Sequence, residues 1–159
     1  MPPTTAAFKS AMRHLPTSVV VAAGMTADAT PVGMLIGSFT SVSLNPLLVG
    51  FLGDHNSTTF PSLLALDHVT FSVLSDDDET TPEAFRLPAD ERFLKAKWSI
   101  TPYGTPVIDG AVLAIHTKQH STHPAGDHTL VLAEVLDTTP PTPNRRPLIY
   151  AEGRMTRLA

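Results

Sequence analysis

Fifteen prolines run through the 159 residues of this chain and divide its apolar segments into short pieces. Proline lacks a backbone N–H and fixes its own φ angle, so it interrupts helices and central strands. The apolar runs between the prolines are rich in valine and other β-branched residues, as at residues 18–24, 47–52 and 68–74. Residues of this kind favour strands. The pattern therefore predicts many short strands with turns between them.

Helical spacing is confined to a few short segments. Apolar residues recur at helical intervals before Pro16, which ends the predicted helix: Phe8, Ala11, Met12 and Leu15. Residues 57–67 predict a second short helix, and residues 75–98 predict one or two more. Further strands are expected at residues 111–118 and 127–137, and a short strand and a tail end the chain. Because strands and helices do not alternate in a βαβ order, we expect a mainly β fold, an antiparallel barrel or sandwich with peripheral helices.

The composition of the chain limits its function. The length fits a single domain over residues 1–159, with no repeat or linker to divide it. A net charge of -4 gives no basic surface for nucleic acid or for an anionic membrane. Thiolate chemistry is excluded because there is no cysteine. With neither a bilayer-spanning apolar run nor a signal-peptide pattern, the chain is expected to be cytoplasmic.

The common catalytic and metal-binding motifs are absent. Neither a G-x-S-x-G elbow nor a glycine-rich phosphate loop of the Rossmann or P-loop type occurs. The seven histidines include a cluster at residues 116–128, but His116 and His120 would share a face only on a helix. This segment favours a strand followed by a loop, so no metal site is predicted.

Hydroxyl side chains cluster between two apolar segments of the sequence, at Ser38, Thr40, Ser41 and Ser43. On a regular strand, Ser38 and Thr40 share one face, and the other two residues lie on the opposite face. Since a flat ligand touches only one face, we expect Ser38 and Thr40 to contact it directly. Ser41 is expected to do so through its backbone or a bulge. Ser43 is expected to cap the turn that follows.

A second polar segment follows the strand predicted at residues 47–52. Asn56, Ser57 and Thr59 lie where the chain passes from this strand to a predicted helix. A helix N-terminus offers free N–H groups and a partial positive charge, and neighbouring hydroxyls would complete a cradle for a phosphate. The alternative is that Ser57 simply caps the helix. The spacing alone leaves both interpretations open.

Several motifs, in their order and spacing, resemble the flavin reductase-like domain family. They are RHLPTSVVVAAG, PVGMLIGSFTSVSLNPLLVGFL, NSTT, ERF, GTPVIDGAV and GDHTLVLAEV. The most specific pieces are SFTSVSLNP and GDHTL, and the similarity extends from about Phe8 to Leu158. The resemblance implies a mainly β fold, an antiparallel FMN-binding split β-barrel with Greek-key topology. It also implies a homodimer with flavin sites near the subunit interface.

The resemblance further implies which residues hold the flavin. The segment that lines the isoalloxazine and the ribityl chain contains Met34, Leu35, Ile36, Ser38, Phe39, Thr40 and Ser41. Asn56, Ser57 and Thr59 match the segment that holds the flavin phosphate. His128 matches a histidine beside the nicotinamide. FMN or FAD would be the flavin, and NADH or NADPH would donate the hydride.

The chain departs from the family pattern at several positions. Leu35 stands in place of a threonine and Gly37 in place of a serine, so two potential hydrogen bonds to the flavin are missing. A basic residue often precedes the phosphate-binding serine, whereas here that neighbourhood offers only His55 and Asn56. Arg92 is considered as a phosphate contact, but its position favours a charged helix face.

The leading hypothesis is an NAD(P)H:flavin oxidoreductase that supplies reduced flavin to a partner monooxygenase. The cofactors hold the reactive atoms in such a reaction, so the lack of an obvious catalytic dyad fits the hypothesis. Two alternatives stay open. One is a flavin carrier or sensor without enzymatic activity, and the other is a haem-binding or pyridoxamine-phosphate-oxidising enzyme on the same barrel.

Overall fold

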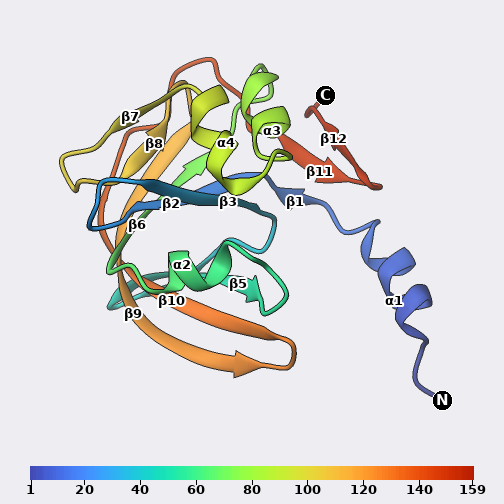
Figure 1. The fold of residues 1–159 in the computed structure, drawn as a ribbon. Coiled ribbons are helices and arrows are strands. Elements are labelled where there is room, and N and C mark those ends of the chain that lie inside the picture. Colours follow the sequence, from blue (N-terminus) through green and yellow to red (C-terminus); the bar gives the residue numbers. More distant parts are fainter.

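The fold is a seven-stranded antiparallel sheet with short helices around it, as a computed structural model of residues 1–159 shows (Figure 1). The strand order is β3-β2-β6-β9-β10-β5-β4. In chain order these strands are β2 (Val20–Met25), β3 (Pro31–Ile36), β4 (Thr40–Leu44), β5 (Leu47–Asp54), β6 (His68–Val73), β9 (Leu113–Ala125) and β10 (His128–Thr138). The consecutive strands β3 and β4 lie at opposite edges, so the sheet curves into a barrel that stays open. This confirms the predicted mainly β fold, and an open sheet is consistent with a split barrel.

Strand β2 is buried on both faces, which explains its continuous apolar sequence. Val20 and Ala22 belong to a cluster inside the curved sheet, together with Phe71 and the α2 (Phe60–Leu64) side chain of Leu63. The intervening residues of β2, such as Val21, point to the other face and join a second cluster outside the sheet. Alternate side chains of a strand point to opposite faces, so a strand between two cores carries no polar face.

The helices α3 (Thr80–Ala84) and α4 (Ala89–Lys95) cover the outer cluster. Phe93 of α4 lies edge-on to the rings of Phe85 and Trp98, with both ring centroids 5.5 Å away. The short strands β7 (Trp98–Ile100) and β8 (Pro106–Ile108) form a separate antiparallel pair. Figure 1 shows α3 and α4 on one side of β2 and β3, and α2 on the other side. One or two helices were expected at residues 75–98, and two are found.

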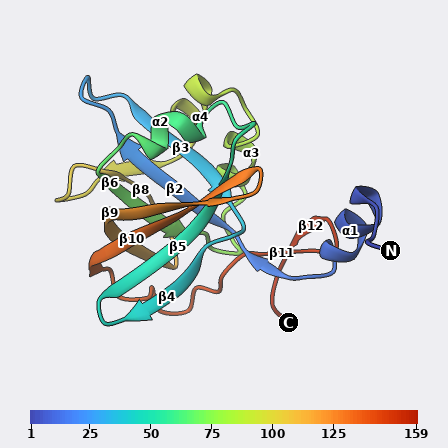
Figure 2. The ribbon, with the colours of Figure 1, turned by 90° about the horizontal axis from the view of Figure 1, so that it is seen from below.

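The N-terminal helix α1 (Thr5–Met12) and the C-terminal strands stand off the barrel (Figure 2). Thr4 caps α1, because its Oγ1 accepts the N–H of Ala7. Strands β11 (Ile149–Ala151) and β12 (Arg154–Thr156) form a hairpin that pairs with β1 (Thr17–Ser18). The apolar side chains of α1 stay exposed, and none of its residues is buried. No helix of the protein is long and apolar enough to cross a membrane.

Several elements differ from the sequence predictions, and the first helix ends at Met12 and not at Pro16. The strand expected at residues 111–118 continues as β9 to Ala125, because β10 pairs with it along its whole length up to a turn at Gly126. The helix expected at residues 57–67 is shorter, since α2 begins only at Phe60. The tail expected after the last strand is the second strand of the β11–β12 hairpin.

Candidate functional site

Strand β5 brings together the segments that the sequence marked as functional. Thr40 pairs with Gly50, Ser38 hydrogen-bonds to Leu52, and His128 pairs with Asp54. The polar segment with Asn56 follows directly where β5 ends. We call residues 55–59 the β5–α2 loop. Three segments far apart in the sequence thus meet along the second half of one strand.

The clustered hydroxyls have different roles. The Oγ of Ser38 accepts the N–H of Leu52 at 2.9 Å and donates to the carbonyl of Leu52 at 3.3 Å, so its only proton is committed to the backbone of β5. Thr40 and Ser41 are exposed. The pairing of β4 with β5 shifts register between Ser41 and Ser43, which is a bulge of the kind considered for this strand. Ser43 accepts the N–H of Asn45, which confirms the predicted turn cap.

The β5–α2 loop is held by hydrogen bonds within the chain. A carboxylate oxygen of Asp54 accepts the N–H of Asn56 at 2.8 Å. The hydroxyl of Ser57 accepts the N–H groups of Thr59 at 3.3 Å and Phe60 at 3.1 Å. Ser57 therefore holds the turn before α2 and accepts the first N–H of the helix, whereas the N-cap position itself is Thr59. Its hydroxyl proton is left free to donate to a ligand.

A glycine in β5 sets the position of this loop. A Cβ at Gly53 would overlap the ring of Phe60. The absence of that atom lets Phe60, the first residue of α2, lie directly on the strand and enter the inner core. Both ends of the loop are therefore held against β5, which fixes the positions of its exposed side chains.

Within the loop, Asn56 and Thr58 are exposed, whereas Thr59 is buried. The side chains of Asn56 and Thr58 have no hydrogen-bond partner within the chain, so they are free for a ligand. The phosphate site expected at a helix N-terminus would therefore be formed by the loop and not by the helix. Since α2 has five residues and begins at Phe60, loop side chains and backbone are the donors here rather than a helix dipole.

Arg92 does not lie on a solvated helix face, and this corrects the sequence interpretation. Its Nη1 donates to the carbonyl of Gly33 at 2.9 Å and to the Thr59 hydroxyl at 3.0 Å. Its Nε donates to the carbonyl of Leu87 at 3.1 Å. Partial burial lowers the pKa of Arg92. The available sequence signal was the ERF motif, which contains Arg92 next to the apolar Phe93.

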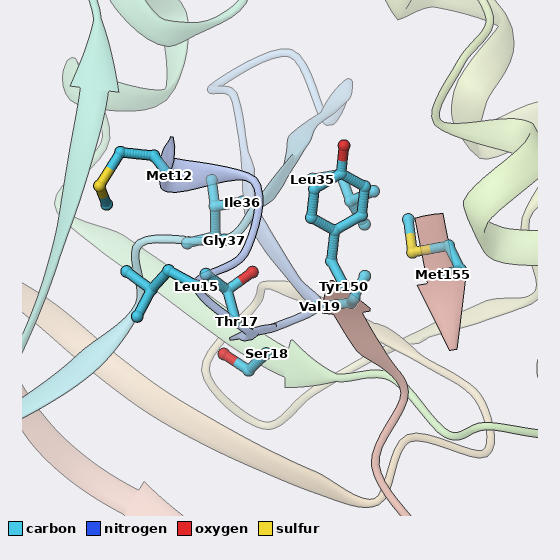
Figure 3. A pocket seen from close by; sticks show the side chains of 10 residues that line it. All are labelled: Met12, Leu15, Thr17, Ser18, Val19, Leu35, Ile36, Gly37, Tyr150 and Met155. Carbon is cyan, nitrogen blue, oxygen red and sulfur yellow. The ribbon is translucent and has the colours of Figure 1, made fainter. Parts of the chain in front are cut away.

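An apolar cavity of about 350 Å³ lies at the end of β3, between α1, β1, β11 and β12 (Figure 3). Leu35, Ile36 and Gly37 line it, together with side chains such as Met12 and Tyr150. The packing of β1 beside this cavity also explains why glycine stands at position 37, where the family pattern has a serine. A Cβ at Gly37 would lie 2.9 Å from the Thr17 hydroxyl, so glycine allows β1 to approach closely.

Two further predicted flavin contacts point toward the core. Phe39 stacks obliquely on Phe71 with ring centroids 4.7 Å apart, and Met34 packs against the same inner cluster. Their side chains stabilise the barrel, and their backbone is what they offer to a ligand. Leu35 belongs instead to the outer side of β3, where it packs against the second cluster. Because successive side chains of β3 point to opposite faces, Met34 and Leu35 pack on different clusters although they are adjacent in the sequence.

His128 lies at the start of β10, beside the β5–α2 loop. Its Nδ1 is 2.7 Å from a carboxylate oxygen of Asp127. The hydrogen bond from His128 lowers the pKa of the Asp127 carboxyl, so Asp127 is ionised at neutral pH. A carboxylate only accepts, and therefore Nδ1 carries the proton and Nε2 faces away from Asp127. The Nε2 of His55 is 2.9 Å from the Thr129 hydroxyl, so this ring is turned to β10.

The histidine and carboxylate side chains of the chain do not gather into a cluster. No group of three or more histidine and carboxylate side chains is close enough to hold an ion. The histidines at residues 116–128 are distributed along β9 and the start of β10, and His116 is buried. The chemistry of the site is therefore that of hydroxyls, an amide, backbone groups, an arginine and a histidine.

Comparison with known proteins assigns the chain to a family. The chain is 34% identical over 146 residues to a flavin reductase of Pseudomonas putida, covering 92% of this chain and 86% of that protein. It is 28% identical over 132 residues to the reductase component of a flavin-dependent trigonelline monooxygenase of Acinetobacter baylyi, covering 83% of this chain and 43% of that protein. The NADH:FAD oxidoreductase of Streptomyces globisporus has a similar structure, with a TM-score of 0.90, 31% identity and coverage of 100% and 96%. The family model of the flavin reductase like domain matches residues 12–159, and the chain belongs to that family.

Proposed function

We propose that this protein is an NAD(P)H:flavin oxidoreductase that passes reduced flavin to a partner monooxygenase. The observation that carries the proposal is the convergence on β5 of the hydroxyl strand, the β5–α2 loop and His128 in a member of this family. Bound flavin would accept a hydride from the nicotinamide and later release the electrons to oxygen chemistry elsewhere. The chain itself needs only to bind and orient the reactants.

The residues along β5 fit a flavin from its phosphate to its ring. The free hydroxyl of Thr58 and the amide of Asn56 suit phosphate oxygens, because both groups donate. Arg92 links Gly33 to the loop by hydrogen bonds. Ile36, which lines the cavity, lies three residues further along β3, so its distance from Gly33 is about 10 Å. A flavin lying along β3 and β5 would place its phosphate at the loop. Its apolar ring edge would lie toward Leu35 and Ile36.

The polar groups of the strand would then contact the middle of the flavin. Thr40 and Ser41 are exposed, and their hydroxyls are suited to the ribityl oxygens and the ring carbonyls. The bulge between Ser41 and Ser43 allows Ser41 to turn toward the same side as Thr40. Ser38, Phe39 and Met34 would contribute mainly through their backbone.

His128 would position the nicotinamide. With Nδ1 committed to Asp127, Nε2 is available for a hydrogen bond to the carboxamide of the nucleotide. Holding two reactants in a reactive geometry contributes about 7–11 kcal/mol to lowering a barrier of this kind. Orientation of the two rings is therefore sufficient, and no acid or nucleophile is assigned.

The activity is tested with purified protein, NADH or NADPH, and FMN, FAD or riboflavin. We expect nucleotide oxidation that depends on both flavin and protein and saturates with each substrate. Turnover no faster than that of free flavin with nucleotide would disprove the proposal. The same assay decides between NADH and NADPH and between FMN and FAD. We place the reaction in the cytoplasm, where reduced nicotinamide nucleotides are available.

The protein is also proposed to act as a homodimer. The apolar side chains of Phe8, Met12 and Leu15 are 56%, 44% and 54% exposed, and α1 buries no residue against its own barrel. A second subunit would cover them and close the cavity beside Leu35 and Gly37. Light scattering after size exclusion tests this. A monomer at micromolar concentration would contradict it, and Phe8→Ser with Met12→Ser should shift a dimer toward monomer.

A further inference from the structure

The phosphate that this site is proposed to bind needs a positive charge, and the surroundings provide few. The chain carries a net charge of -4, and the carboxylate of Asp54 lies at the base of the β5–α2 loop. His55 is hydrogen-bonded through Nε2 to Thr129. Arg92 is the one guanidinium or ammonium group that hydrogen-bonds to the loop, through Thr59.

The environment of Arg92 differs from that of most other arginines in the chain. Four of them form ion pairs with carboxylates: Arg86, Arg145, Arg146 and Arg157. Arg92 is half-buried and has only neutral partners, the carbonyls of Gly33 and Leu87 and the hydroxyl of Thr59. A guanidinium remains charged at neutral pH in spite of partial burial. Its charge is therefore uncompensated within the chain, immediately behind the loop.

The hydrogen bonds of Arg92 also connect the two halves of the proposed flavin site. One nitrogen, Nη1, donates both to Gly33 in β3 and to Thr59 in the loop. Gly33 is tightly enclosed, since a Cβ there would lie 2.8 Å from the ring of Phe93 and 3.0 Å from the carbonyl of Ala22. Helix α4 thus fixes the spacing between β3 and the loop through neighbouring side chains, Arg92 and Phe93.

We propose that Arg92 is the positioning residue for the flavin phosphate. Acting through the Thr59 hydroxyl, it fixes the β5–α2 loop against β3 and supplies a positive charge from behind the loop. The proposal rests on the flavin reductase function proposed above. It assigns to Arg92 a contribution that depends on the phosphate and not on the flavin ring.

The test compares FMN with riboflavin, which has the same ring and ribityl chain but no phosphate. Binding is followed by flavin fluorescence for the wild type, Arg92→Gln, Arg92→Lys and Thr59→Val. A charge-assisted contribution predicts that Arg92→Gln weakens FMN binding by about tenfold or more. Riboflavin affinity should stay within about twofold, because its binding involves no phosphate charge. Arg92→Lys should be intermediate, since it keeps the charge but loses the forked geometry.

Controls separate this role from a general effect on folding. Arg86→Gln removes a neighbouring, exposed arginine and should leave the ratio of FMN to riboflavin affinity unchanged. Salt should weaken FMN binding more in the wild type than in Arg92→Gln. If Arg92→Gln does not fold, Thr59→Val removes the hydroxyl that transmits the contact and should show the same selective loss of FMN.

Equal weakening of FMN and riboflavin in these variants, or no change in either, would overturn the proposed role of Arg92. A different result concerns the function itself. If the wild type binds flavins but never oxidises nucleotide, the reductase proposal fails while the phosphate role of Arg92 can still be read from the affinity ratio. A wild type that binds neither flavin overturns both.

Discussion

The hydroxyl of Ser38 spans the gap between two strands by making both of its hydrogen bonds to Leu52. Leu52 donates to it at 2.9 Å and accepts from it at 3.3 Å. Ser38 precedes β4 in the chain and Leu52 lies in the middle of β5, so this side chain replaces a missing pair in the backbone ladder. The residue thus has a structural task at the point where the sequence suggested a direct ligand contact.

We expect Ser38→Ala to lower the free energy of unfolding by about 1–2 kcal/mol, because two hydrogen bonds are lost and a backbone N–H is left without a partner. Ser41→Ala should have little effect on stability, since Ser41 is exposed. Denaturant unfolding with and without FMN measures both effects. If Ser38→Ala is as stable as the wild type but binds flavin weakly, Ser38 is a ligand contact after all.

The fit between Gly53 and Phe60 gives a second prediction. Gly53→Ala should destabilise the protein by about 1–3 kcal/mol, because its Cβ overlaps the Phe60 ring and forces the start of α2 away from β5. Flavin affinity should fall as the loop moves. Gly50→Ala, in which the nearest side-chain atom is at 3.1 Å, is a milder control in the same strand. Combining Gly53→Ala with Phe60→Leu should recover part of the loss, and additive losses would contradict this explanation.

The contact between Asp127 and His128 predicts a change specific to the nucleotide. Asp127→Ala should raise KM for NADH several-fold, because His128 loses the acceptor that fixes its tautomer and its ring orientation. Asp127→Asn should be milder, since its amide oxygen still accepts from Nδ1. Steady-state kinetics and flavin titration measure the two effects separately. A larger loss of flavin affinity than of nucleotide affinity would place this pair at another part of the site.

The buried residue His116 makes stability depend on pH. Its Nδ1 is 2.9 Å from the Thr70 hydroxyl, and its ring stacks on Tyr103 with centroids 4.9 Å apart. Burial lowers the pKa of His116, although the nearby charge of Asp137 opposes this shift. In the unfolded chain a histidine titrates near pH ~6.5. Below that value the unfolded state takes up a proton that the folded state resists, so stability falls as the pH falls.

Thermal unfolding measured from about pH 8 down to about pH 5 tests this prediction. The wild type should lose more stability over this range than His116→Gln, which has no titrating ring. His120→Gln is the matched control, because His120 is exposed on the same strand. Parallel curves for the wild type and His116→Gln would show that other groups cause the pH dependence.

Several elements could be predicted because their determinants are local. The caps at Thr4 and Ser43 join residues that are within three positions of each other. Several strands of the seven-stranded sheet are visible in the sequence as β-branched runs. The motifs around Ser38–Ser41 and at Asp127-His128 also identified the segments that meet on β5. Residue types and spacing suffice for features of this kind, because the interacting atoms are close together in the chain.

Other features depend on partners that are distant in the sequence. Strand β9 extends to Ala125 because β10 pairs with it, and glycine at position 37 fits the close approach of the Thr17 side chain. Arg92 faces inward because Gly33 and Thr59, which are 59 and 33 residues away, accept its hydrogen bonds.

The sequence by itself determined the mainly β character of the chain, its family and the segments that carry the candidate site. The tertiary structure decided which side chains of those segments are free. Ser38 and Ser57 are engaged with the backbone, while Thr58 and Ser41 remain exposed. The physical reason is that a buried or bridging polar group takes whichever partner the fold brings within hydrogen-bond distance. The order of residues in the sequence does not show which polar groups the fold brings within that distance.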